Sequence, residues 1–92
     1  MLRITVLCQT ATQTVLRLEG ELARDAVRLL GEQVAGHLRG SSQVVLDLDG
    51  VTYVDPAGTE LLVGGPAARC ALRGGSMYVR TLLAARGPGA WD

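Results

Sequence analysis

The sequence predicts a single α/β domain, with a mixed sheet of about four strands in chain order and helices packed on one side of it. Apolar and polar residues alternate over residues 2–6 and 15–20, which is the period of a half-buried strand. Between Leu22 and Leu38, apolar residues recur at steps of three and four, which is the period of an amphipathic helix. A further alternating run, residues 44–49, follows the helix. A strand, a helix and a strand in succession predict a right-handed crossover between parallel strands.

The first two strands are expected to form an antiparallel hairpin, with a turn at residues 9–13, which are rich in Gln and Thr. The helix is expected to open near Glu21 and to end at residues 39–40, a basic residue followed by a glycine. Gly31 and Gly36 would each cost up to about 1 kcal/mol relative to Ala inside a helix. Packing rather than propensity should therefore stabilise it.

Residues 44–58 form the stretch around which the chain is organised. A turn is expected at residues 49–50, after which the chain returns to the sheet and enters a second helix at Pro56. Asp55 is the predicted N-cap, because its carboxylate can accept a hydrogen bond from a free backbone N–H of the first turn. Pro56 suits the first helical position, since it has no N–H to leave unpaired and its φ is already helical.

The second helix is expected over residues 56–72, with a kink or break near Gly64 because Pro66 removes a backbone donor. Residues 77–81 then predict the last strand. The domain is expected to span residues 1–92 and to end in a short flexible tail at residues 87–92.

The charge balance excludes several partners. Nine basic residues match nine acidic ones, so there is no electrostatic footprint for nucleic acid or for an anionic membrane. The chain has neither an apolar run of about 20 residues nor a signal peptide, so we expect a cytoplasmic protein that does not insert into a membrane. All nine basic residues are Arg, which excludes a Walker-type phosphate loop and a phosphoacceptor site that needs a lysine.

The titratable residues do not predict an enzyme. Cys8 and Cys70 are expected to be small buried apolar residues rather than a disulfide or redox pair. With His37 they are too few and too far apart to bind zinc, so no metal and no cofactor is expected. Asp47 and Asp49 are expected at a strand end on the edge of the sheet, without a catalytic role.

Several short motifs together resemble the STAS domain family, which includes anti-sigma factor antagonists and C-terminal domains of sulfate transporters. They are D-L-D-G-V-T-Y-V-D-P-A-G at residues 47–58, T-E-L-L-V-G directly after it, R-G-G-S-M-Y-V at residues 73–79, and G-E-L at residues 20–22. The resemblance covers residues 2–81 and implies that G-E-L opens the first helix. It also implies a C-terminally shortened domain, in which Leu82, Leu83 and Trp91 remain to cover the sheet.

The resemblance implies a protein partner. In the antagonists, the loop and helix start that match Asp55, Pro56, Ala57, Gly58 and Thr59 dock onto an anti-sigma factor of the GHKL serine kinase type. Regulated members usually read D-S-S-G or D-S-T-G here, so the phosphorylated hydroxyl would fall on Ala57, which has none. The negative charge of a phosphate is tolerated at such a position because a helix N-terminus carries free N–H groups and the positive end of the helix dipole.

Three functions remain open from the sequence. The preferred one is a non-catalytic interaction module resembling an anti-anti-sigma factor and not phosphorylated at the usual site. The alternative is a cytoplasmic STAS subunit of a transporter complex, which regulates a membrane lipid or anion transporter. The third is a scaffold or homodimer, in which Asp55 and Pro56 are only a helix cap.

Overall fold

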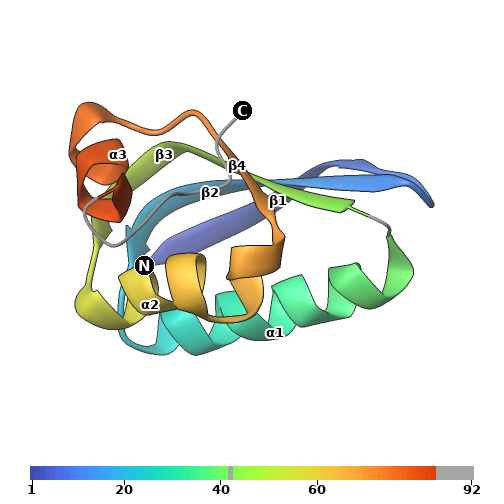
Figure 1. Cartoon of the computed structure of the whole chain (residues 1–92), viewed down its shortest axis with the longest axis horizontal. Helices are drawn as coiled ribbons and strands as arrows, with labels where there is room; N and C mark the ends of the chain where they lie inside the picture. The colour runs from blue at the N-terminus through green and yellow to red at the C-terminus, as the bar shows by residue number, and fades with distance from the viewer. Residues whose placement is uncertain (42, 85–92) are drawn as a thin grey trace.

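The computed structural model describes residues 1–41 and 43–84, and its four strands form one mixed sheet in the order β1-β2-β3-β4. This confirms the predicted fold class (Figure 1). The elements in chain order are β1 Leu2–Gln9, β2 Gln13–Leu22, α1 Asp25–Gly40, β3 Gln43–Val54, α2 Pro56–Gly64, the 3-10 helix η1 Pro66–Arg69, β4 Ala71–Arg73 and α3 Met77–Ala84.

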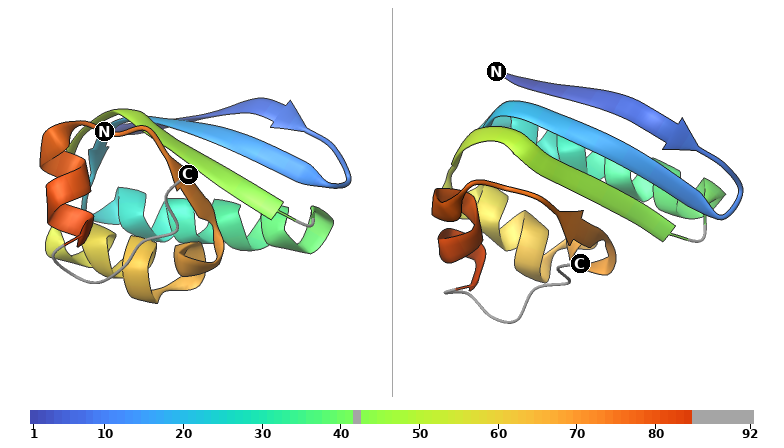
Figure 2. Two further views of the ribbon diagram at one scale, coloured as in Figure 1. Left: turned by 45° about the horizontal axis from the view of Figure 1, so that its top comes forward. Right: turned by 90° about the horizontal axis from the view of Figure 1, so that it is seen from above.

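The strand pairing follows the prediction. β1 pairs antiparallel with β2, while β2 pairs parallel with β3 across the α1 crossover. β3 also pairs parallel with β4, so β3 is an interior strand. Figure 1 shows α1 and α2 on the same face of the sheet, and Figure 2 shows α3 standing beside the end of β3 and the start of α2.

The core lies between the sheet and the helices. Leu16, Leu46 and Leu72 are register partners on β2, β3 and β4, and each is at most 2% exposed. Leu30 and Val34 on α1 pack onto the same cluster. Burying one such side chain stabilises the fold by about 1.5–3 kcal/mol, so the periodicity seen in the sequence marks the residues that hold the layers together.

An ionic cluster joins β2, β3 and β4. Asp47 lies between Arg17 and Arg73, its register partners on β2 and β4, with N–O distances of 3.9 and 3.6 Å. The Asp47 side chain is 8% exposed, and its Oδ1 also accepts a hydrogen bond from the Asp49 amide at 3.0 Å. The expectation of a strand end at the sheet edge was wrong, because both aspartates lie within the interior strand β3.

β3 does not turn at residues 49–50, as was predicted. It continues to Val54, and the β2–β3 register shifts between Arg17 and Glu19. A Cβ on Gly50 would lie 2.6 Å from Cγ of Glu19 and 3.0 Å from the Leu18 carbonyl oxygen. Glycine is therefore needed here for close approach of two strands rather than for a turn.

The first helix begins later than predicted. β2 runs through the G-E-L motif to Leu22, and α1 starts only at Asp25. Gly20 has φ +107°, which favours glycine, and Leu22 pairs with Val54. Because these pairings hold residues 20–22 in the sheet, they are not available to open a helix.

The chain after α2 also differs from the prediction. The expected break is confirmed, since α2 ends at Gly64 and η1 follows. Residues 71–73, assigned to the end of the helix, instead form β4, and residues 77–81, assigned to a strand, lie in α3. Ser76 explains the helix: its Oγ accepts a hydrogen bond from the Val79 amide at 3.2 Å, which is an N-cap contact.

The remaining expectations have mixed outcomes. Cys70 is buried as expected, but Cys8 is exposed because β1 is an edge strand. Leu83 is fully buried and Leu82 packs partly against the core, whereas Trp91 and the expected tail at residues 87–92 lie outside the described residues. Among residues 1–41 and 43–84, no helix has the length and apolar character needed to cross a membrane.

Candidate functional site at the start of α2

Asp55 caps α2 as the sequence predicted. It has extended backbone angles, and its Oδ1 accepts a hydrogen bond from the Gly58 amide at 2.7 Å. Pro56 occupies the first helical position, and the Thr59 amide donates to the Asp55 carbonyl at 2.9 Å. These contacts satisfy donors that a helix start would otherwise leave unpaired, so the segment is held in one conformation.

Asp55 also binds the turn between β2 and α1. Its Oδ2 accepts a hydrogen bond from the Arg24 amide at 3.1 Å, and its own amide donates to the Leu22 carbonyl at 3.1 Å. Arg24 has φ +56° and ψ −126°, a sparsely populated conformation that costs a non-glycine residue about 1–3 kcal/mol. One carboxylate therefore fixes two neighbouring turns, and no pattern in the sequence singles out Arg24 as its partner.

The five predicted binding residues differ in accessibility. Pro56 and Ala57 are exposed and Asp55 is partly exposed, whereas Gly58 and Thr59 are buried. The Thr59 hydroxyl is 3.1 Å from the Asp55 carbonyl, to which it donates a hydrogen bond, and the residue is only 3% exposed. A molecule approaching this helix start would thus meet Pro56 and Ala57.

Gly58 is buried because α2 enters close to β2. A Cβ at this position would lie 2.7 Å from the Leu22 carbonyl oxygen and 3.0 Å from Cγ1 of Val54. The backbone of α2 therefore approaches the ends of β2 and β3 more closely than any larger residue would permit. This contact sets the angle at which Ala57 is presented at the surface.

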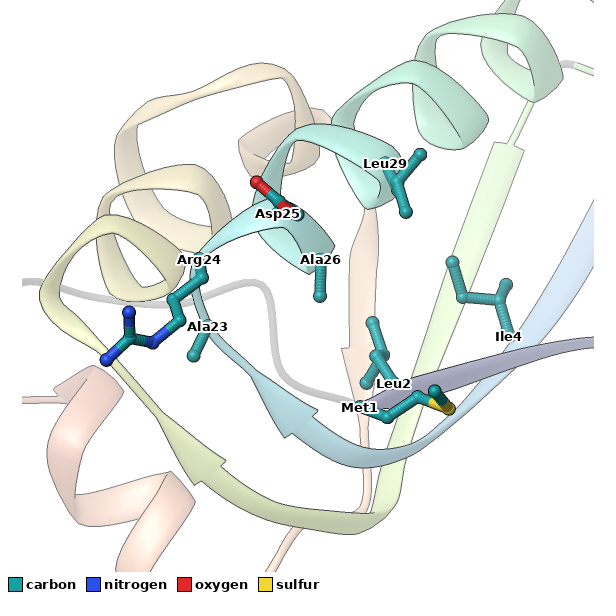
Figure 3. A pocket seen from close by; sticks show the side chains of 8 residues that line it. All are labelled: Met1, Leu2, Ile4, Ala23, Arg24, Asp25, Ala26 and Leu29. Carbon is teal, nitrogen blue, oxygen red and sulfur yellow. The ribbon is translucent and has the colours of Figure 1, made fainter.

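A shallow pocket of about 320 Å³ lies on the other side of the β2–α1 turn, between β1 and α1 (Figure 3). Its apolar lining includes Leu2, Ile4, Ala26 and Leu29. In Figure 3 the Arg24 guanidinium points away from Leu2 and Ile4. The pocket gathers no set of convergent polar groups of the kind that fixes a small ligand.

Within the part of the chain that the structure describes, no three His, Cys, Asp or Glu side chains gather as metal ligands. Burial raises the pKa of the Cys70 thiol to about 11, which keeps it protonated and unreactive at neutral pH. What the site offers is a rigid, exposed helix start.

The chain has a mixed four-stranded sheet covered by helices on one face (Figure 1), with a capped helix start after its third strand. The chain belongs to the family whose model is described as "Mlab, STAS domain", which matches residues 6–86. This confirms the family to which the sequence motifs pointed. No functionally curated protein shows significant similarity to the chain.

Solved structures of other proteins share the fold. The anti-sigma factor antagonist SpoIIAA in its unphosphorylated form is 21% identical, with a TM-score of 0.75 over 91% of this chain and 80% of the other. The Bacillus cell fate determinant SpoIIAA in its phosphorylated form is 20% identical, with a TM-score of 0.69 over 92% and 84%. A DUF3478-family protein with a SpoIIAA-like fold from Shewanella loihica PV-4 is 12% identical, with a TM-score of 0.60 over 99% and 83%.

Proposed function

We propose that this protein is a non-catalytic interaction module of the anti-sigma factor antagonist type, which acts in the cytoplasm by binding an anti-sigma factor of the serine kinase type. The observation that carries the proposal is the exposed pair Pro56 and Ala57 at a helix start that Asp55 holds rigid. A surface that is already ordered loses little conformational entropy on binding, so it suits recognition by a partner. Membership of the STAS family and the SpoIIAA-like fold support this assignment.

In this protein Ala57 prevents the site from being regulated by phosphorylation at residue 57. In a phosphorylated relative, a phosphate would add about two negative charges to the docking surface and release the partner by desolvation and repulsion. The methyl group of alanine takes the place of the Cβ methylene of an unphosphorylated serine, and the acceptor oxygen is missing. The chain therefore acts as a constitutively binding form that a kinase does not switch off at residue 57.

Calorimetric titration of the full chain against each purified anti-sigma serine kinase of the source organism tests the proposal. We expect one kinase to bind the parent, and Ala57→Asp to weaken binding at least tenfold through one added charge. Ala11→Asp, in the exposed β1–β2 turn, introduces the same charge at the opposite end of the sheet and should leave the affinity unchanged.

Two results would overturn the proposal. One is that none of the kinases binds; binding of a purified transporter ATPase or permease instead would assign the chain to a transport complex. The other is kinase binding that Ala57→Asp leaves within twofold of the parent, which would place the docking surface elsewhere on the domain.

A further inference from the structure

The tyrosines of the chain gather where β3 leads into α2. The sequence contains two Tyr and one Trp, and the structure describes both tyrosines. Tyr53 lies two residues before Asp55 on β3, and Tyr78 reaches the same place from α3. They are 45% and 46% exposed, so neither belongs to the core.

Tyr78 is held beside the junction by α3. Its hydroxyl lies 3.5 Å from both the amide nitrogen and the carbonyl oxygen of Val54, at the outer limit of a hydrogen bond. The next residue, Val79, and Leu83 are fully buried and anchor the helix. The ring is therefore positioned by packed neighbours, yet about half of it remains accessible.

Tyr53 projects from the strand rather than into the core. Its neighbour Val54 is 4% exposed and belongs to the hydrophobic cluster, and successive side chains of a strand point to opposite faces. The register partner of Tyr53 on β2 is Glu21. Within residues 1–41 and 43–84 the Tyr53 hydroxyl has no hydrogen-bond partner, so it is available to an external acceptor.

Two half-exposed tyrosines next to the α2 start contribute little to the core, and a role in binding a partner accounts for their position. Tyrosine is enriched at protein interfaces because it supplies a large rigid apolar area, a polar tip and little side-chain entropy to lose. Met77, 81% exposed, adds apolar surface beside Tyr78. Charged side chains stand at the rim, where Glu21 and Arg24 carry opposite signs and are both exposed.

We propose that Tyr53 and Tyr78 are the aromatic anchors of the surface on which the anti-sigma kinase docks, next to Pro56 and Ala57. This inference rests on the proposed function. The complementary partner surface has apolar pockets that receive the two rings and a hydrogen-bond acceptor for the Tyr53 hydroxyl.

Titration of single variants against the kinase that binds the parent tests the assignment. Tyr53→Ala and Tyr78→Ala should each weaken binding at least fivefold, which corresponds to the loss expected for an interface anchor. Tyr53→Phe should lose less than Tyr53→Ala, since it keeps the ring and removes only the hydroxyl. Leu7→Ala is the matched control: Leu7 is 42% exposed and lies on β1 at the other end of the sheet.

Thermal unfolding of each variant separates docking from folding. If Tyr78 serves only to cover Val54, its replacement will lower the melting temperature and leave the affinity of the folded protein unchanged. Affinities of both alanine variants within twofold of the parent overturn this inference alone, provided that Ala57→Asp still weakens binding. A parent chain that binds no kinase overturns the proposed function and this inference together.

Discussion

The Arg24 amide donates a hydrogen bond to Oδ2 of Asp55 at 3.1 Å, while Oδ1 of the same carboxylate caps α2 through the Gly58 amide at 2.7 Å. The two residues are 31 positions apart, and their contact joins the turn that opens α1 to the turn that opens α2. The surface that carries Ala57 is thus fixed by a shared side chain rather than by local sequence alone.

The first prediction follows from this double role. Asp55→Ala removes both acceptors and should lower the free energy of unfolding by about 1–3 kcal/mol, more than loss of a cap alone. Asp55→Asn keeps one acceptor for the Gly58 amide but can place an NH₂ group against the Arg24 amide, so its loss should be intermediate. Urea unfolding measures the order. An Asn variant as stable as the parent would show that the contact with Arg24 contributes nothing.

Replacement by alanine should destabilise the protein at Gly58 and stabilise it at Gly36. Gly58→Ala places a Cβ 2.7 Å from the Leu22 carbonyl oxygen, so we expect a loss of about 1–3 kcal/mol from overpacking. Gly36 lies inside α1, and a Cβ there would lie 3.9 Å from the nearest side-chain atom, Nη2 of Arg39, so Gly36→Ala should gain about 0.5–1 kcal/mol from helix propensity. Thermal unfolding of both variants checks the signs, and a destabilised Gly36→Ala would contradict the account of α1.

Replacing different members of the cross-strand ionic cluster should cost different amounts of stability. Asp47→Ala should cost about 1–3 kcal/mol, because Asp47 is buried and its loss leaves the Asp49 amide without its acceptor. Arg17→Ala should cost at most about 1 kcal/mol, since its side chain is 48% exposed and the pair is long. Denaturant unfolding compares them. Equal losses would mean that the ion pair, not the buried acceptor, stabilises β3.

The cysteines should differ in reactivity. Cys8 is exposed and should react with iodoacetamide within minutes, whereas Cys70 is 1% exposed and its pKa is raised to about 11 by burial. Raising the pH from 7 to 9 should therefore leave Cys70 protonated and unlabelled in the folded protein. Because the folded pKa of about 11 lies above the ordinary value of 9.0, unfolding releases the proton at alkaline pH, and the fold should lose stability as the pH rises from about 9 towards 11. Intact mass spectrometry counts the adducts. The Cys8→Ser variant should remain unmodified until urea is added.

A hydroxyl at residue 57 should restore regulation. The parent, incubated with the bound kinase and ATP, should gain no phosphate between Thr52 and Thr59. Thr59 is buried with its hydroxyl hydrogen-bonded, and the Thr52 hydroxyl donates a hydrogen bond to the Gly20 carbonyl. Ala57→Ser should gain one phosphate and then bind more weakly. Peptide mass spectrometry followed by titration decides it. A phosphate on the parent in this segment would contradict the constitutive role of Ala57.

The sequence by itself determined the elements whose signals are local. The alternation in β1 and β2, the helical period of α1 and the Asp55-Pro56 cap depend on residues a few positions apart, and each was predicted correctly. The position of Ala57 in the first turn of α2 also follows from its neighbours Asp55 and Pro56. The family motifs, read in sequence order, predicted the fold for the same reason.

Tertiary structure decided the features that depend on contacts between distant residues. The local sequence predicts a turn at Gly50, but β2 lies against this residue and β3 stays extended. The local sequence likewise places Leu22 in a helix, but its pairing with Val54 holds it in the sheet. The three residues of β4 are too few for a periodic signal, and pairing with β3 defines them. The contact of Arg24 with Asp55 and the gathering of Tyr53 and Tyr78 arise only when the chain folds, because long-range packing brings together residues that no local pattern relates.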